Sequence, residues 1–425
     1  MQNFKFFLYS FVMVIVVVSF FFSPDVARGE EDDESDPISL ETIIEEAESG
    51  SANAQLLLGK MYFYGDAELE QDDEEAVAWF KAAAAQGLPT AQFNYGVCLE
   101  TGRGVEKPDP DEALEWFMKA ADQGFAEAQL NAAVGLEKRG KFGPALRYYV
   151  QLAKTDHSGA LRKAATFFER GIGLQSPQPD LAFEYMYRAA VMGDVRAQVR
   201  LADYCQRGIG TNSDPQRMLE WLWLAAGNGD PEAQAKLGFC YQQGLVVARD
   251  LETAVKWLRK SAEAGYAPAQ VALGNAFLDG EGVQKDTIEA MKWFQLAAKQ
   301  EYGPAFFSLA VAHTIGRGVK KDMDRALRLY ERSAELGYAP AAYNLGYLYE
   351  KGEGVSSNLK TAVKWYAKAA KNNDPNALHA LGTLYLEGTG VGKDRNKAKS
   401  LLQRAAELGS IAAQQDLLTN FSEAQ

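Results

Sequence analysis

Helix-capping residues recur along this chain at an interval of 36 positions, and this periodicity limits the fold more than any other feature. Four residues after each stands alanine or methionine, and three residues further on stands a bulky residue, usually tryptophan. The capping residues are Asp72, Asp109, Asp214, Asp250, Asp286, Asp322, Asn358 and Asp394, of which the last six fall 36 residues apart. We call the bulky sites the ladder positions and, because they recur at the same point of each second helix, expect them to lie in the core: Trp79, Trp116, Trp221, Trp257, Trp293, Leu329, Trp365 and Leu401. A period of this length is typical of stacked helical hairpins.

Each period contains two helices and two breaks. The carboxylate of Asp250 can accept from the free amides of a first helical turn, and Gly265 can adopt the left-handed conformation that ends that helix. A second amphipathic stretch then ends at Gly280-Glu281-Gly282, before the next cap. One such hairpin cannot bury both of its faces, so the copies must stack. We therefore expect an all-α, right-handed α/α superhelical solenoid of about ten helix-turn-helix repeats.

Segments outside the repeats divide the rest of the chain. Residues 1–29 combine Lys5, an apolar run from Phe6 to Phe22 and the small-x-small site Ala27-Arg28-Gly29, which predicts a signal peptide or an uncleaved membrane anchor. An acidic linker (30–38) and an N-terminal capping helix (39–50) follow. The ten repeats are expected over 51–410, with a C-terminal capping segment at 411–425. Only 32 residues separate Ala128 from Ala160, so the third repeat is irregular.

Charge and cysteine content narrow the class of protein. The chain has 57 acidic against 44 basic residues, for a formal charge of -13. Because phosphate binding needs a basic stripe, nucleic acid is not the expected partner. Cys98, Cys205 and Cys240 have no CxxC spacing. A Cys205–Cys240 disulfide is conceivable, but neighbouring helix axes lie about 8–10 Å apart, which favours three buried thiols.

The repeats resemble the Sel-one-like repeat (SLR) family, relatives of the tetratricopeptide class. The resemblance rests on Leu273-Gly274, the Gly280-x-Gly282-Val283 loop, and the alanine, tryptophan and Ala-Ala that follow Asp286. It extends over nearly all of residues 52–409, although Gly244-Leu245-Val246-Val247 lacks the second loop glycine. The resemblance implies a scaffold for protein assembly, and for exported bacterial members a role in envelope assembly, regulation or host binding.

Catalytic motifs are not expected. Ser357-Asn358-Leu359-Lys360 has the S-x-x-K spacing of penicillin-interacting enzymes, but the S-D-N and K-T-G partners do not occur in the sequence. The histidines, His157, His313 and His379, belong to distant repeats. We expect a non-catalytic protein-interaction scaffold or adaptor, without cofactor or metal, in the bacterial periplasm or outside the cell, with inner-membrane anchoring as the alternative. An envelope-directed hydrolase and an architectural membrane-anchored assembly factor are the alternative functions.

Variable positions on the first helices are candidate contacts for an extended protein or peptide, because first helices generally line the inner groove of superhelical arrays. For any single candidate residue, the simpler interpretation is that it is an exposed surface residue with no binding role. The candidates are Asn94, Lys163, Arg200, Asp203, Lys236, Phe239, Asn275, Asn344 and Tyr347.

A second candidate surface lies on the second helices of repeats two to five. Each second helix has an alanine or methionine in its first turn. Five residues beyond it, these repeats carry Met118, Val150, Tyr187 and Trp223, whereas most others carry polar or small residues. Stacking would align the four into an apolar ridge, and aromatic anchors dominate the energetics of interfaces. The alternative, which has nearly equal weight, is that these residues pack internally.

Overall fold

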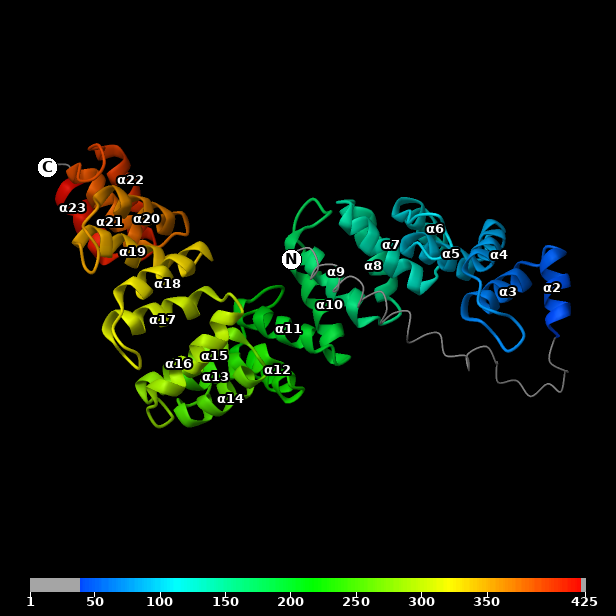
Figure 1. Ribbon diagram of the computed structural model, residues 1–425, viewed down its shortest axis with the longest axis horizontal. Helices are drawn as coiled ribbons and strands as arrows, with labels where there is room; N and C mark the ends of the chain where they lie inside the picture. Colours follow the sequence, from blue (N-terminus) through cyan, green and yellow to red (C-terminus); the bar gives the residue numbers. More distant parts are fainter. Residues whose placement is uncertain (1–38, 422–425) are drawn as a thin grey trace. The chain divides into compact units, whose positions relative to one another are not determined.

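In the computed structural model, residues 39–421 are described, and every regular element among them is an α-helix (Figure 1). The chain divides into two compact units, with the boundary between Asn131 and Ala132. The described part of the first unit contains α2 (Leu40–Glu48), α3 (Ala52–Tyr64), α4 (Asp73–Ala85), α5 (Pro89–Thr101) and α6 (Pro110–Asp122), and α7 (Ala126–Lys138) crosses the boundary. The signal or anchor segment (1–29) and the acidic linker (30–38) lie outside the described residues.

The second unit continues the alternation of first and second helices. Each helix packs mainly on its neighbours in sequence, as a one-dimensional stack requires. The helices are α8 (Phe142–Ala153), α9 (Ser158–Arg170), α10 (Pro179–Val191), α11 (Val195–Arg207), α12 (Pro215–Gly227), α13 (Pro231–Gln243), α14 (Leu251–Glu263), α15 (Ala267–Asp279), α16 (Thr287–Lys299), α17 (Gly303–Ile315), α18 (Met323–Glu335), α19 (Ala339–Lys351), α20 (Leu359–Lys371), α21 (Pro375–Glu387), α22 (Arg395–Glu407) and α23 (Ile411–Phe421). None of the helices in residues 39–421 combines the length and apolar character needed to cross a membrane.

The predicted capping residues all occupy N-cap positions. Each of the eight accepts hydrogen bonds from first-turn amides through its side chain; Asp250, for example, accepts from the Thr253 amide at 3.0 Å. Gly265 has φ +90° after the end of α14, as predicted for a left-handed helix terminus. The periodicity therefore reports real helix boundaries.

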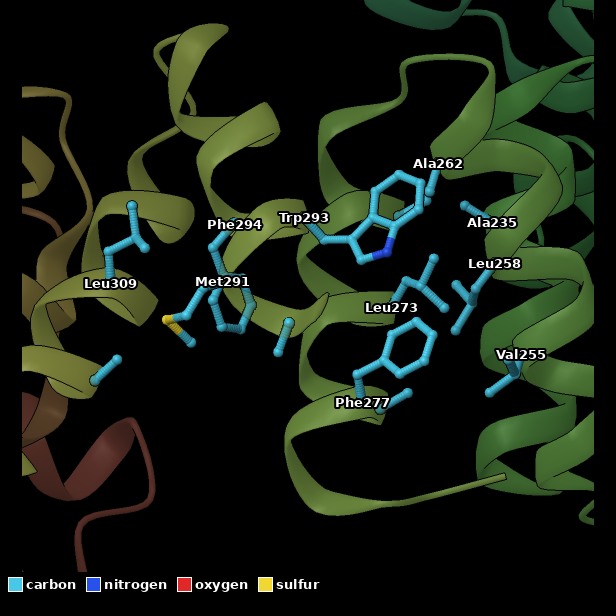
Figure 2. Packing of buried hydrophobic residues seen from close by; sticks show 14 residues of the cluster. Ala235, Val255, Leu258, Ala262, Leu273, Phe277, Met291, Trp293, Phe294 and Leu309 are labelled. Carbon is cyan, nitrogen blue, oxygen red and sulfur yellow. The ribbon is translucent and has the colours of Figure 1, made fainter. Parts of the chain in front are cut away.

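The ladder positions are not the centre of the core, which corrects the sequence interpretation. Trp293 is buried, but Trp257 and the other ladder tryptophans are only partly buried. The residue after each ladder position is the buried one, such as Leu258 in α14 and Phe294 in α16. Figure 2 shows Leu258 directed toward Leu273 of the next first helix.

Small residues on the first helices make room for these buried side chains. A Cβ atom on Gly274 would lie 2.5 Å from the Phe294 ring, and one on Gly238 would lie 2.7 Å from Leu258. Since no real Cβ tolerates such a distance, glycine here sets how closely the two helices of a hairpin approach. The Leu-Gly motif is a packing motif.

Buried glutamines join successive hairpins, a feature that the sequence analysis missed. The Gln270 side chain donates to the Ala262 carbonyl of the preceding helix at 3.1 Å and accepts from Gln300 at 3.0 Å. The same donation to a carbonyl eight residues earlier recurs at Gln55, Gln92, Gln129, Gln198 and Gln234. The signal in the sequence is an Ala-Gln pair at the start of six first helices.

The three cysteines are free and buried, so the expectation of buried thiols is confirmed. Burial raises the pKa of the Cys98 thiol to about 12, and it also raises the pKa of Cys205 and of Cys240. Thiols of this kind are poor nucleophiles at neutral pH, because the thiolate is the reactive form.

Candidate functional site

Three ion pairs join the four consecutive first helices α7, α9, α11 and α13, and we call these ion pairs the charge row. Lys163 of α9 binds Glu137 of α7 at 2.9 Å. Arg200 of α11 binds Glu169 of α9 at 2.8 Å, and Lys236 of α13 binds Asp203 of α11 at 2.7 Å. Four predicted groove residues, Lys163, Arg200, Asp203 and Lys236, therefore bind acidic or basic side chains of neighbouring repeats.

Tyrosines reinforce the acidic side of the charge row. The Tyr149 hydroxyl donates to Glu137 at 2.7 Å, and the Tyr204 hydroxyl donates to Glu169 at 2.9 Å. Burial, together with the nearby carboxylate, raises the pKa of each hydroxyl well above its usual value. Both hydroxyls therefore stay protonated and hold the carboxylates in place.

The basic side of the row remains charged. Burial opposes the charge of Lys236, but hydrogen bonds to Asp203 and Glu232 prevail and raise the pKa of this ammonium group. Glu169 likewise raises the pKa of Arg200 against the effect of burial. These fixed charges lie on the first-helix face, where a partner segment was predicted to bind.

A depression of about 380 Å³ lies next to the charge row, between α9, α11 and the start of α13. We call it the arginine pocket. Its lining includes Arg162, Arg170, Arg196 and Arg200, with Thr166, Val199, Asp230 and Glu232 completing it. The sequence analysis selected only Arg200 from this set. The missed signal was composition, since α9 and α11 each carry three basic residues against a single acid, Glu169 or Asp203.

The acidic residues of the arginine pocket are already engaged. Asp230 caps α13 by accepting from the Ala233 amide at 2.8 Å, and Glu232 binds Lys236 at 2.9 Å. Arg162 binds Asp194 at 3.2 Å. Arg170 and Arg196 are exposed and make no ion pair within residues 39–421. The pocket therefore has two guanidinium groups whose donors are free for a ligand.

The remaining predicted groove residues are dispersed. Asn94 of the first unit is only 7% exposed, so a partner could not contact its side chain directly. Its amide nitrogen has no hydrogen-bond partner in residues 39–421. Phe239 packs partly against the core, while Asn344 is partly buried. Asn275 and Tyr347 are exposed on α15 and α19.

Aromatic residues of the predicted ridge pack on the repeat that follows. The Tyr187 ring meets Trp221 edge-on with centroids 6.0 Å apart, and Trp223 meets Trp257 at 5.2 Å. Tyr187 and Trp223 nevertheless remain 39% and 41% exposed. Met118 and Val150 are partly buried, and Met118 belongs to the other unit. Internal packing accounts for one face of these rings, and docking on the other face stays a prediction.

Each histidine makes a structural contact. His157 caps α9 by accepting from the Ala160 amide at 3.1 Å, and His379 lies 2.9 Å from Asp416 of the last described helix. His313 is buried, with a ring nitrogen 3.3 Å from the Lys320 carbonyl oxygen. In the described part of the chain, no histidine forms a hydrogen bond with a serine or cysteine that it could activate.

The helical pairs, the small-residue contacts and the first-helix face define a helical repeat protein of the solenoid class. The family model for the Sel1 repeat matches residues 52–88, 89–125, 158–194, 195–230, 231–266, 267–302, 305–338, 339–374 and 375–410. The chain belongs to the Sel1 repeat family, as the resemblance suggested. The unmatched interval 126–157 contains α7 and α8, where the short third repeat was predicted.

Solved structures of the same fold support this assignment. One is a protective antigen present in uropathogenic Escherichia coli strains that displays an SLR fold, with 31% identity, a TM-score of 0.63, and coverage of 90% of this chain and 83% of that one. A Sel1 repeat protein from Oxalobacter formigenes has 25% identity, a TM-score of 0.51 and coverage of 89% of both chains. No curated protein matches this sequence significantly. Sel1 repeat proteins generally serve as protein-interaction scaffolds.

Proposed function

We propose that this protein is a non-catalytic scaffold or adaptor that binds an extended segment of a partner protein along its first helices. The observation that carries the proposal is the arginine pocket, where Arg170 and Arg196 present donors on that face and make no ion pair with any residue in 39–421. The structural contacts of the three histidines favour a scaffold over an envelope hydrolase. An architectural role at the membrane remains the other candidate if residues 1–29 stay attached.

Site-specific photo-crosslinking tests which face binds. A photoreactive residue at Asn275 or Tyr347 samples exposed positions on the first helices α15 and α19. The same residue at Lys256 or Lys364 samples exposed positions on the second helices α14 and α20 and is the matched control. We expect protein adducts from the first-helix positions and few from the controls. Equal adduct yields from both sets would contradict the proposal.

We also propose that the protein acts in the bacterial periplasm or outside the cell, because residues 1–29 have the charge and apolar pattern of an export signal. N-terminal sequencing of the mature protein distinguishes a cleaved signal peptide from an uncleaved membrane anchor. A new N-terminus close to Glu30 supports cleavage. An intact Met1 in the membrane fraction supports the anchored, architectural alternative.

A further inference from the structure

The side chains that line the arginine pocket are regularly spaced along α9 and α11. Arg162, Thr166 and Arg170 stand four residues apart on α9, and Arg196 and Arg200 stand four residues apart on α11. Residues four apart on a helix share a face and lie about 6 Å apart. The pocket is thus lined by two parallel rows of side chains, with guanidinium groups in both.

The spacing of these rows matches that of an extended peptide. Successive residues of a strand advance about 3.3 Å, so side chains at i and i+2 lie on one side about 6.6 Å apart. Guanidinium groups form paired hydrogen bonds with carboxylates in their own plane. Carboxylates at positions i and i+2 of an extended segment can therefore meet Arg196 and Arg200 on α11. On α9, Arg162 and Arg170 are eight residues apart with Thr166 between them, which corresponds to positions i and i+4 of the segment.

The distribution of charge favours a short acidic segment over a long polyanion. Outside α9 and α11, the first helices of the second unit carry few basic residues, and the whole chain has a formal charge of -13. A nucleic acid running along the array would leave the basic pocket and meet first helices that have few basic residues to bind its phosphates. A few carboxylates are enough to fill 380 Å³.

We infer that the arginine pocket binds an extended acidic segment of a partner protein, with Asp or Glu at alternate positions. Arg170 and Arg196 supply the donors that have no ion pair within residues 39–421. Arg162 and Arg200, held by Asp194 and Glu169, fix the positions of the two rows. This inference rests on the proposed scaffold function and specifies the chemistry of its partner.

Peptide binding to the full-length protein tests the inference. The probes are three fluorescent eight-residue peptides: alternating Ser and Glu, the same residues as a Ser block followed by a Glu block, and alternating Ser and Gln. Fluorescence anisotropy at low salt should give the tightest binding for the alternating acidic peptide, with the block peptide at least about fivefold weaker and the Gln peptide unbound. Affinity should fall as salt rises, because the contacts are ionic.

Variants of the pocket provide the matched control. Arg170→Ala combined with Arg196→Ala removes two exposed, unpaired charges, so folding should be unaffected and affinity should fall about tenfold or more. Arg325→Ala combined with Arg328→Ala removes the same charge from exposed positions on α18 and should change affinity less than twofold. Equal losses in the two variants would overturn the inference.

Other outcomes are also decisive. Equal binding of the alternating and block peptides, or no binding of either, would overturn the inference, as would a phosphoserine peptide that binds far more tightly than the acidic one. First-helix crosslinks that persist in those cases would leave the scaffold function standing. If those crosslinks were also missing, the scaffold function would fail with the inference.

Discussion

At the scale of single residues, the loops between helices depend on backbone conformation more than on side-chain chemistry. Gly282 has φ +70°, and a Cβ atom there would lie 2.1 Å from the Leu251 carbonyl oxygen of the preceding second helix. The repeat that lacks this glycine places Val246 in the same conformation, with φ +69°. A β-branched residue in this region is strained.

Val246→Gly should therefore stabilise the protein by about 1 kcal/mol, because relief of strain outweighs the added freedom of the unfolded chain. Val247→Gly is the control, since Val247 is not in the left-handed region and should only lose entropy and packing. Denaturant unfolding of the two variants measures the difference. A lower unfolding midpoint for Val246→Gly would contradict the strain argument.

At the scale of helices, hairpins are joined by buried polar contacts as well as by apolar packing. Gln270 links α15 to the end of α14 and to Gln300 at the end of α16. Arg103, in the loop after α5, binds Asp73 of α4 at 2.7 Å and donates to the Phe63 carbonyl of α3 at 2.7 Å. Such contacts fix how one repeat sits on the next.

Gln270→Leu should destabilise the protein by about 1–3 kcal/mol, although leucine is apolar and of similar size. The substitution removes two hydrogen bonds, the one to the Ala262 carbonyl, which keeps its bond from the Gly265 amide at 3.0 Å, and the one from Gln300. At about 0.5–1.5 kcal/mol for each hydrogen bond, their loss costs about this much. Gln243→Leu, at an exposed position, is the control and should change stability little. Thermal unfolding distinguishes them, and equal effects would count against a structural role for the buried amide.

The Arg103–Asp73 contact should make stability depend on pH. The hydrogen bond from Arg103 lowers the pKa of Asp73 below 3.8, despite an opposing effect of burial. A carboxyl group with a lowered pKa stabilises the fold above its unfolded pKa and loses that effect as pH falls through the folded value. The stability difference between wild type and Asp73→Asn should therefore be present at pH 7 and should shrink below about pH 4.

The stability of Glu74→Gln, measured over the same pH range, is the control for the general effect of removing one negative charge from this helix. Glu74 lies on the same helical turn but makes no ion pair within residues 39–421. A difference between wild type and Asp73→Asn that stayed constant from pH 7 to pH 2.5 would show that the contact with Arg103 does not depend on ionised Asp73.

At the scale of the whole molecule, a stack of hairpins should transmit damage to its nearest neighbours first. The three buried thiols are natural reporters, because Cys98 lies in α5 of the first unit, Cys205 in α11 and Cys240 in α13. Leu258 of α14 lies against Gly238, which belongs to α13, the helix that contains Cys240.

Leu258→Ala should therefore expose Cys240 to thiol reagents first, Cys205 more slowly, and Cys98 no faster than in the wild type. Removing a buried leucine costs about 2–5 kcal/mol, which is enough to raise local opening by orders of magnitude. Mass spectrometry of timed labelling gives the order. Trp257→Ala, which alters the partly buried ladder position beside it, should accelerate labelling less. Simultaneous labelling of all three cysteines would contradict a one-dimensional stack.

The sequence by itself determined the helices, their caps and their order, because a capping carboxylate such as Asp250 and a glycine such as Gly265 act within a few residues of themselves. Its pattern placed both Trp257 and Leu258 in the core, whereas the structure buries Leu258 and leaves Trp257 only partly buried. It also did not reveal that Lys163 would bind Glu137, or that four arginines would share one pocket. These contacts join residues about 26 to 38 positions apart, and only the stacking of one hairpin on the next brings them within the few ångströms over which side chains interact.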